Sequence, residues 1–327
     1  MAFNKLSELQ QLAYDVYKGN TNNFSKEEGQ EAIRGAILDA IGGEWSYYNF
    51  QRNKYDVYQI LSEVLSISTG EILTSQFDRF AEVKDLALGD QNTFIIEDTS
   101  LFDVATIASS TNDLRRQKLY SNRLTVETEE EGVKIYAEFN QFMAGRIDFA
   151  SMINRVSLSI AHKTGTRIYN GIYDSYASLS APYGVTGTYS EATLADIIAH
   201  VEASTGKKAS VFGTKKALGK ITLSQYAEKT KEQLNELGYV GKFKGTDVLE
   251  LPQVHKAGTH EFLVNDDFLL IIPSDEKIVK IVLEGQAFVD DVKDGGARND
   301  RQIEFLLSRR IGVGVIKSSV YGIYKIS

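Results

Sequence analysis

The spacing of hydrophobic residues predicts three helices within residues 1–83. Apolar side chains recur there at steps of three or four residues, as they do on the buried face of a helix. Ser25 resembles the N-cap of the second helix, and Gly42 and Gly43 are expected to end it. The third helical pattern covers Tyr55–Ile67. We therefore expect an N-terminal helical arm.

The pattern becomes extended over residues 84–122. The apolar residues come in short groups within polar sequence, and they are too sparse to form a core of their own. A structureless loop of this length is unusual inside a compact domain. The segment is therefore predicted to be a long two-stranded ribbon that projects from the body and lies against another surface.

A hairpin and one long helix are expected in residues 123–183. Apolar and polar residues alternate on both sides of Glu129–Gly132, so this short run is expected to be the turn of the hairpin. Residues 145–179 contain no proline and keep helical spacing throughout. This spacing predicts a single helix roughly 45 Å long.

Helices and strands alternate over residues 184–300, which predicts a compact α/β unit. The run Phe268–Ile272 is continuously apolar and is followed by Pro273, as in a strand that is buried on both faces. Residues 301–327 are expected to form strands that return beside the long helix. The predicted fold class is therefore α+β.

Composition narrows the class of protein. At 327 residues the chain exceeds the size at which a single core stops growing, so two packed units are expected. A net charge of −8 argues against a surface whose main task is gripping nucleic acid, because such binding needs an excess of Lys and Arg. The absence of cysteine excludes disulfides, thiolate catalysis and cysteine-ligated metals.

The sequence also shows no secretory signal and no candidate membrane-spanning segment. The N-terminus has no apolar core of the kind that a secretory signal needs, and no apolar run is long enough to span a bilayer. We therefore expect the protein to stay in a cytoplasm-like compartment.

A glycine-rich stretch, GYVGKFKGTDVLELPQ, raises the question of a phosphate-binding loop. Gly238, Gly241 and Gly245 do not have the spacing of such a loop, and no Gly-Lys-Ser/Thr sequence leads from them into a helix. Glycine is favoured in turns because it adopts positive φ at no steric cost. These three glycines are therefore predicted to shape a turn, and no nucleotide cofactor is expected.

No metal site is predicted either. His255 and His260 are five residues apart, which places them on different faces of a helix or strand, so we interpret them as surface loop residues. The run Asp290–Gly296 resembles a calcium loop, but Val292 and Arg301 stand where ligands are required. A carboxylate pair formed in space stays open, since sequence alone does not reveal it.

Charged residues gather around the end of the predicted ribbon. Four basic residues are followed directly by an acidic run: Arg115, Arg116, Lys118 and Arg123, then Glu129, Glu130 and Glu131. One interpretation is a solvated hairpin stem with weak local ion pairs. The other is a set of intersubunit contacts, in which the basic ribbon meets the acidic patch of a neighbouring copy and fixes the register between subunits.

The order of the parts resembles the major capsid proteins of tailed bacteriophages, whose Hong Kong-type shell fold is shared with encapsulins and the herpesvirus capsid floor. ALGDQNTFIIED and ATIASSTNDLRRQK resemble the E-loop of that family, and GRIDFASMINRVSLSI resembles its spine helix. ASVFGTKKALGKI and GYVGKFKGTDVLELPQ are similar to parts of the axial (A) domain. FLLIIPSDEKIVKI and EFLLSRRIGVGVIKSSVYGIYKIS resemble strands that lead back to the peripheral (P) domain.

The resemblance implies a domain map and a function. The map is an arm at 1–83, an E-loop at 84–122, P-domain hairpin and spine helix at 123–183, an A domain at 184–300 and P-domain strands at 301–327. The implied protein is not an enzyme. It would self-assemble into pentamers and hexamers that form an icosahedral head around double-stranded DNA, in the cytoplasm of a host bacterium.

The resemblance also implies partners. These are other copies of the chain, a portal protein and, in some phages, scaffolding and decoration proteins, with no membrane and no sequence-specific DNA contact. One alternative is an encapsulin-like compartment shell that carries enzyme cargo. A second, from another class, is a soluble hydrolase that uses a carboxylate pair.

Overall fold

The structure is a computed structural model, and each statement below concerns the residues that it describes. These residues are 26–97, 102–106, 115–117, 121–138, 141, 149–222, 234–256, 258–274, 276–291, 303–316 and 321–326. The chain divides into two compact units. Unit 1 takes residues 1–91, 127–167 and 280–313, and unit 2 takes 92–126, 168–279 and 314–327.

Unit 1 begins with two helices, α2 (Lys26–Ile41) and α3 (Tyr47–Phe77). The predicted apolar face of α2 is confirmed, since Ile33, Ile37 and Ile41 are all buried. Two glycines with positive φ follow the last residue of α2, as the sequence predicts. The helix expected before Ser25, and Ser25 itself, lie outside the described residues.

Helix α3 has 31 residues and is much longer than the predicted segment Tyr55–Ile67. Its C-terminal half buries hydroxyl side chains where an apolar stripe would be expected. Ser68 and Thr69 are fully buried; the Ser68 hydroxyl lies 2.6 Å from that of Ser157, and Thr69 donates to the carbonyl of Leu65. Because these polar groups are satisfied internally, they can be buried, and they conceal the helical periodicity from a count of hydrophobic residues.

A four-stranded sheet completes unit 1, in the order β1-β10-β11-β4. Its strands are β1 (Ala81–Leu86), β10 (Val279–Asp291), β11 (Ile303–Val315) and β4 (Thr128–Ala137). Helix α3 is fastened to β10 by two of its serines: Ser62 donates to the carbonyl of Ala287, and the amide of Ala287 donates to Ser66 over 2.8 Å.

The hairpin predicted around Glu129–Gly132 is wrong. These residues lie in the N-terminal half of β4, which pairs antiparallel with β11 in a register that sets Glu129 opposite Ile311 and Gly132 opposite Ser308. Three adjacent glutamates are unusual in a strand, which is why they resembled a turn. Their charges are held by partners on other elements, so the strand continues through them.

Unit 2 contains a mixed six-stranded sheet in the order β5-β12-β9-β6-β8-β7. The strands are β5 (Gly184–Gly187), β12 (Gly322–Ile326), β9 (Phe268–Pro273), β6 (Ala209–Gly213), β8 (Thr246–Glu250) and β7 (Lys242–Phe243). Two helices belong to the same unit, α6 (Glu191–Thr205) and the short α7 (Lys215–Leu218), whose N-cap is Thr214.

The long helix predicted within 145–179 is confirmed as α5 (Phe149–Tyr176), although α3 is longer still. Residues 168–176 of α5 belong to unit 2 and cover one face of its sheet, while α6 covers the other. Leu269 and Ile271 of β9 pack into the same core as α6, and Leu270 faces Ile172 of α5. Coverage on both faces explains why β9 is continuously apolar, as predicted from its sequence.

Two strands join a sheet other than the one expected. β10 lies within residues 184–300, yet it belongs to the sheet of unit 1, because it pairs with β1 and β11. β12 lies beside the long helix, as expected, since Ile323 faces the same cavity as Ile172 of α5. It does not share a sheet with β11, however, but pairs with β5 and β9 in unit 2. Apolar alternation identified both strands, but it carries no information about pairing partners.

The glycine-rich stretch forms a turn, as predicted for Gly238 and Gly245. Both have positive φ, at 80° and 92°. Lys244 (φ 46°) and Gly245 connect the paired residues Phe243 and Thr246, and two successive positive φ values are typical of a type I′ hairpin turn. Gly241 does not share this feature.

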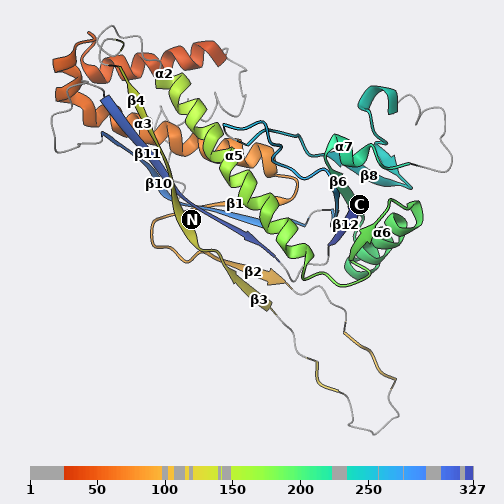
Figure 1. The fold of residues 1–327 in the computed structure, drawn as a ribbon. Helices are drawn as coiled ribbons and strands as arrows, with labels where there is room; N and C mark the ends of the chain where they lie inside the picture. The colour runs from red at the N-terminus through yellow and green to blue at the C-terminus, as the bar shows by residue number, and fades with distance from the viewer. Residues whose placement is uncertain are drawn as a thin grey trace. The chain divides into compact units, whose positions relative to one another are not determined.

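The ribbon is formed by β2 (Thr93–Glu97) and β3 (Ser121–Thr125), which pair antiparallel (Figure 1). Residues 84–86 of the expected ribbon belong instead to β1. At the base of the ribbon the chain passes very close to Gly314. A Cβ atom built on Gly314 would lie 2.9 Å from Cγ2 of Val126 and 3.3 Å from Cδ2 of Leu124. The glycine in β11 therefore leaves the space that these two side chains fill.

We predict that Gly314→Val destabilises the protein by about 1–3 kcal/mol, because overpacking forces neighbouring side chains and backbone to move. Thermal unfolding measures the loss, and hydrogen exchange of residues 124–126 should rise. Gly35→Ala is the control: nothing lies within 4 Å of the added methyl group, and the site is helical, so stability should stay level or increase. Equal melting temperatures for Gly314→Val and the parent chain would contradict the close packing.

A hydrogen-bonded carboxylate holds the segment before β9 to α7. Asp266 accepts from the Thr214 hydroxyl over 2.7 Å, from Gln253 over 3.1 Å and from Lys216 over 3.3 Å. Burial acts to raise the pKa of Asp266, but these three donors outweigh it, so the pKa lies below its ordinary value of 3.8. The stabilisation is therefore present above pH 3.8 and is lost as the pH falls through the lowered pKa.

We predict that Asp266→Asn lowers the free energy of unfolding at neutral pH by about 2 kcal/mol, as expected for hydrogen bonds to a charged group. The loss should shrink as the pH falls from 5 to 3, since the parent chain then gives up the same stabilisation. Urea titrations at several pH values measure it. Asp267→Asn, which removes an exposed pair with Lys220, should have a much smaller effect.

Candidate assembly surface

The two faces of the ribbon differ in their exposure to solvent. Phe94 is opposite Leu124 in the ladder and is only 5% exposed, whereas its neighbour Ile95 is opposite Arg123 and is 70% exposed. Successive residues of a strand point to opposite faces. One face of the ribbon is therefore packed, and the other exposes Ile95 beside the exposed Arg123.

Beyond the ladder, a side chain joins the two arms of the ribbon. The amide of Asp103 donates to Oε1 of Gln117 over 2.8 Å, and Nε2 of Gln117 donates back to the carbonyl of Asp103 over 2.6 Å. The side-chain amide thus reproduces the paired hydrogen bonds of a strand ladder at a point outside β2 and β3. This contact keeps the arms together where apolar packing is sparse.

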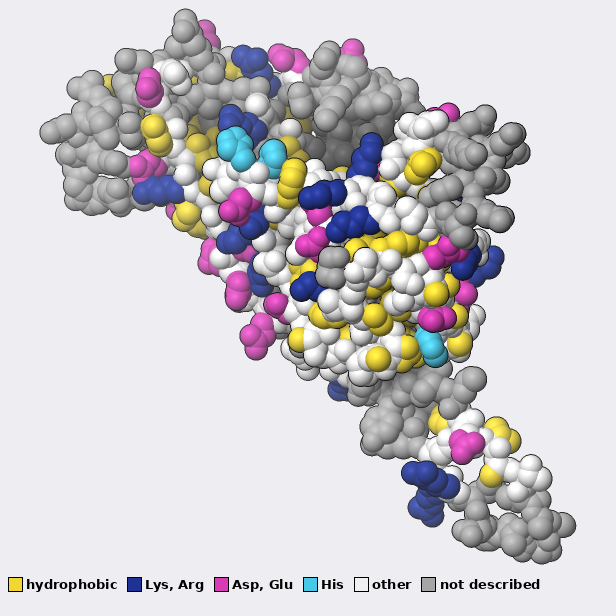
Figure 2. Space-filling model, turned by 45° about the vertical axis from the view of Figure 1, so that its right-hand side comes forward, with side chains coloured by type: hydrophobic (Ala, Val, Ile, Leu, Met, Phe, Trp, Pro, Cys, Tyr) yellow, Lys and Arg dark blue, Asp and Glu magenta, His cyan; other side chains and the backbone are white. Residues whose placement is uncertain are grey.

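The described part of the ribbon beyond β2 and β3 exposes both apolar and cationic side chains (Figure 2). Phe102 is 53% exposed and Val104 is 90% exposed, and Arg115 and Arg116 are also exposed. Lys118 lies outside the described residues. Exposed apolar residues that are grouped on one segment make this part of the ribbon a candidate interaction surface.

The acidic run on β4 is used largely within its own chain. Arg167 of α5 donates to Glu131 over 2.9 Å, reaches Glu129 at 3.3 Å, and donates to the carbonyl of Ile311 over 3.3 Å. Glu130 accepts from the hydroxyl of Ser308 over 2.7 Å. The basic residues of the ribbon belong to unit 2 and these glutamates to unit 1.

The three glutamates differ in exposure. The side chain of Glu131 is 4% exposed and that of Glu129 is 73% exposed, and Glu130 is exposed as well. Because the carboxylate of Glu131 is buried and paired with Arg167, it is not accessible to a second copy. The carboxylates of Glu129 and Glu130 are accessible.

A buried arginine lies between α3 and the sheet of unit 1. Arg309 of β11 is 1% exposed; it donates to the carbonyl of Ser66, and its other terminal nitrogen lies 3.5 Å from a carboxylate oxygen of Asp85. Burial lowers the pKa of Arg309 to about 10, and Asp85 opposes this shift. Since 10 is still well above neutral pH, Arg309 stays charged and holds α3, β1 and β11 together.

Sequence reasoning missed Arg309, and it also missed two further charged groups that are important to the fold. Arg167 lies in the predicted long helix, and Glu284 lies in a predicted strand, where it is 6% exposed. Glu284 directly follows the buried apolar residues 281–283, and this contrast is the signal that could have identified it. No comparable signal surrounds Arg167. The partners of both residues come from distant parts of the chain.

His255 and His260 lie in an exposed loop, as predicted. His255 is bridged to Phe262, the two rings stack with centroids 5.2 Å apart, and the ring of His260 meets that of His255 edge-on at 6.1 Å. Within the described ranges, no group of three or more His, Asp or Glu side chains is placed to hold a metal ion. No described helix has the length and apolar character needed to cross a membrane.

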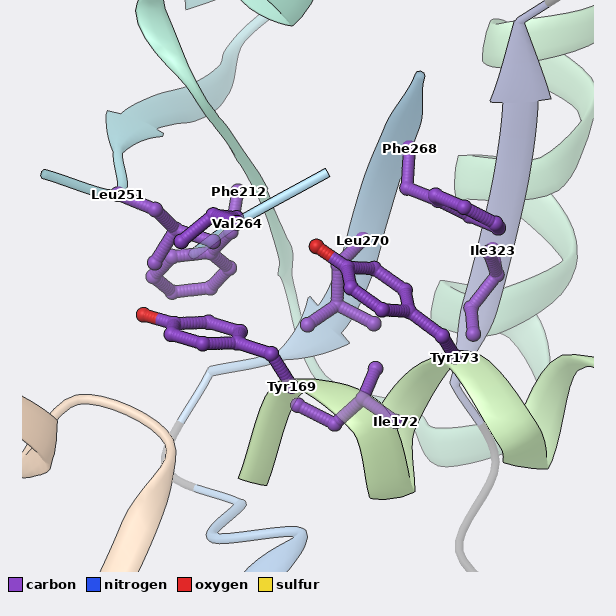
Figure 3. A pocket seen from close by; sticks show the side chains of 9 residues that line it. All are labelled: Tyr169, Ile172, Tyr173, Phe212, Leu251, Val264, Phe268, Leu270 and Ile323. Carbon is purple, nitrogen blue, oxygen red and sulfur yellow. The ribbon is translucent and has the colours of Figure 1, made fainter. Parts of the chain in front are cut away.

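A small cavity lies between α5 and the sheet of unit 2 (Figure 3). Tyr169, Ile172 and Tyr173 point into it from the helix. Its volume of about 10 Å³ holds one water molecule at most, far less than a substrate needs. Burial raises the pKa of Tyr173 to about 12, although its hydroxyl accepts a hydrogen bond from the amide of Asn265. The cavity is a packing defect of the core.

Comparison with known proteins gives one family and one fold. Residues 6–325 match the model of the family described as "SPbeta prophage-derived putative capsid protein YonB". No curated protein sequence gives a significant match. Among solved structures, the capsid of a native GTA particle is 14% identical with a TM-score of 0.52, and covers 78% of this chain and 90% of that chain.

Two phage capsids are similar to the same extent. The mature capsid of bacteriophage PhiM1 is 12% identical with a TM-score of 0.51, covering 77% of this chain and 86% of that chain. The capsid of cyanophage P-SCSP1u is 11% identical with a TM-score of 0.50, covering 77% and 88%. At these identities the similarity concerns the fold, and that fold is the one expected from the sequence.

We predict that Arg167→Met destabilises the protein by about 3 kcal/mol, because it leaves the carboxylate of Glu131 buried without its partner. Adding Glu131→Gln should restore most of the loss. Arg155→Met, an exposed position on the same helix, is the matched control and should be nearly neutral. Urea unfolding measures the free energy of unfolding of the parent chain and of the three variants. If the double variant is no more stable than Arg167→Met, the pair does not hold the helix to β4.

Proposed function

The chain belongs to the YonB family of capsid proteins, and from this membership we propose that it forms the head shell of a tailed phage as pentamers and hexamers around double-stranded DNA. It is a capsid shell protein of the virion. The finer proposal concerns how copies join, what they enclose, and where assembly takes place.

The observation that carries the proposal is the ribbon. Isolated pairs of strands are marginally stable, and this pair exposes Ile95, Phe102 and Val104. A neighbouring copy that covers these residues would bury them and make a head-to-tail contact. Contacts of this kind close into rings when the rotation between subunits allows it. Obligate interfaces of about 2,000 Å² or more can be built from such extended parts without enlarging the core of the monomer.

In this proposal each part of the fold has a role in the shell. The ribbon is the E-loop, α5 is the spine helix, the sheet of unit 1 is the P domain and the sheet of unit 2 is the A domain. We assign β10 to the P domain and β12 to the A domain in this proposal, because β10 pairs within the sheet of unit 1 and β12 within the sheet of unit 2. The glycine turn before β8 then lies in the A domain.

The intersubunit contacts follow from exposure. We propose that Arg115, Arg116 and Arg123 meet the accessible carboxylates of Glu129 and Glu130 on a neighbouring copy. Opposite charges at such a contact would steer association and fix its register more than its strength. Glu131 is left out of this contact because Arg167 occupies it in its own chain.

The charge of the chain fits a container for DNA. A net charge of −8 keeps the shell from gripping phosphates, so the genome can be packed and released. We further propose that assembly takes place in the cytoplasm of the host bacterium, that the shell includes a portal protein at one vertex, and that scaffolding or decoration proteins take part. Neither a cofactor nor catalysis is part of this function.

The experiment is to express the chain and examine it by negative-stain microscopy and sedimentation. The proposal predicts uniform closed particles or ring-shaped capsomers. Particles from infected cells should contain nuclease-protected DNA, whereas an enzyme compartment would hold protein cargo. A chain that stays monomeric at high concentration, with its ribbon protected from exchange, would contradict the proposal.

We predict that Phe102→Ser combined with Val104→Ser prevents particle formation while leaving the melting temperature of the unassembled chain unchanged, because both side chains are exposed before assembly. Phe288→Ser in β10 is the control for composition, since Phe288 has the same 53% exposure as Phe102 but lies outside the ribbon. Sedimentation gives the assembled fraction. Normal particles from the ribbon variant would remove these residues from the interface.

A further inference from the structure

A single buried carboxylate holds both ends of the ribbon segment. Glu284 of β10 is 6% exposed. Its Oε1 accepts from the amide of Gly89 over 3.1 Å, and its Oε2 accepts from the hydroxyl of Thr128. Gly89 follows β1, and Thr128 is the first residue of β4. Residues 90–127, which contain the ribbon, therefore leave and rejoin unit 1 at one side chain.

An arginine adds a second set of contacts to this carboxylate. Nε of Arg310 lies 3.7 Å from Oε2 of Glu284, and the same guanidinium donates to the hydroxyl of Thr128 over 3.5 Å. A buried carboxylate is costly unless hydrogen bonds and an opposite charge compensate it. Here three partners from a turn, β4 and β11 provide that compensation, so the ribbon ends and the charge stabilise one another.

The backbone around Gly89 is shaped for this contact. Residues 87–90 form a turn, closed by the amide of Asp90 bonding to the carbonyl of Ala87 over 3.1 Å. Gly89 stands at its third position with φ 87°, which leaves its own amide free of the turn and available to Glu284. Gly285, next to the carboxylate, also has positive φ, and a Cβ there would lie 3.6 Å from Leu88.

We propose that Glu284 is a positioning residue for assembly, which sets the ribbon for docking by fixing the two points where residues 90–127 join the sheet. This inference rests on the proposed function for its consequence in the shell. Closing a long flexible segment costs entropy, and that cost recurs whenever the ends separate. With both ends held at one carboxylate, the ribbon starts from a fixed base, so less order has to be gained when a neighbouring copy binds it.

The sharpest variant is Thr128→Val, which removes one hydrogen bond to Glu284 and keeps a β-branched residue in the strand. Thr125→Val at the end of β3 is the matched control, because it makes the same change at an exposed position of the ribbon itself. Glu284→Gln is the second variant, and it removes the charge while keeping the shape of the side chain.

Assembly is the first readout. Thr128→Val should raise the critical concentration for particle formation about tenfold, the factor that corresponds to one hydrogen bond to a carboxylate. Glu284→Gln should raise it at least as much, and Thr125→Val should leave it unchanged. Circular dichroism should show that all three chains are folded. Particles that form at the parent concentration from both Thr128→Val and Glu284→Gln would overturn the proposal.

The second readout works on the unassembled chain and separates this proposal from the proposed function. Since the chain has no cysteine, Val104→Cys on the ribbon and Asp56→Cys on α3 take two spin labels without further changes. Thr128→Val should broaden the distribution of distances between the labels, and Thr125→Val should not. An unchanged distribution in Thr128→Val refutes the positioning role, even in a chain that does not assemble. If Thr128→Val broadens the distribution while the parent chain itself forms no particles, the positioning role is supported and the shell function is refuted.

Discussion

The constraint on which this structure depends is that two strands alone cannot cover their own apolar side chains. In β2 and β3 one face is packed through Phe94, and the other leaves Ile95 in solvent. Further along the ribbon, the arms are joined by the amide of Gln117 instead of by packing. A segment built in this way reaches its lowest free energy against another surface. The compact sheets of the two units provide the stability that lets the chain carry such a segment.

Buried charged side chains help to determine how the elements of unit 1 are arranged. Arg309, Glu131 and Glu284 are all buried in unit 1. Arg309 and Glu284 each have partners from at least two other parts of the chain, and Glu131 is paired with Arg167 of α5. Such groups add little net stability compared with apolar side chains, but any arrangement that leaves them buried without partners is strongly destabilised. They therefore specify one way of placing α3, α5 and the strand order β1-β10-β11-β4 against each other.

The sequence was informative where a periodic apolar face decides the structure, and uninformative where partners come from distant residues. The isoleucines of α2 and α5 predicted both helices, and the apolar run of β9 predicted a strand buried on both faces. The hairpin around Glu129–Gly132 failed because Arg167, which neutralises two of these glutamates, is recognisable as their partner only in the folded chain. The ribbon was predicted from its polarity, but not the way in which Gln117, Gly314 and Glu284 secure it.

The chain passes between the two units five times, at residues 91, 126, 167, 279 and 313, so neither unit is one continuous piece of polypeptide. A truncated gene cannot produce either unit by itself. Each unit therefore needs segments from three separate parts of the coding sequence. Insertions are best tolerated in exposed surface loops away from these crossings and away from the ribbon. The surface loops can therefore change in length while both units keep their fold.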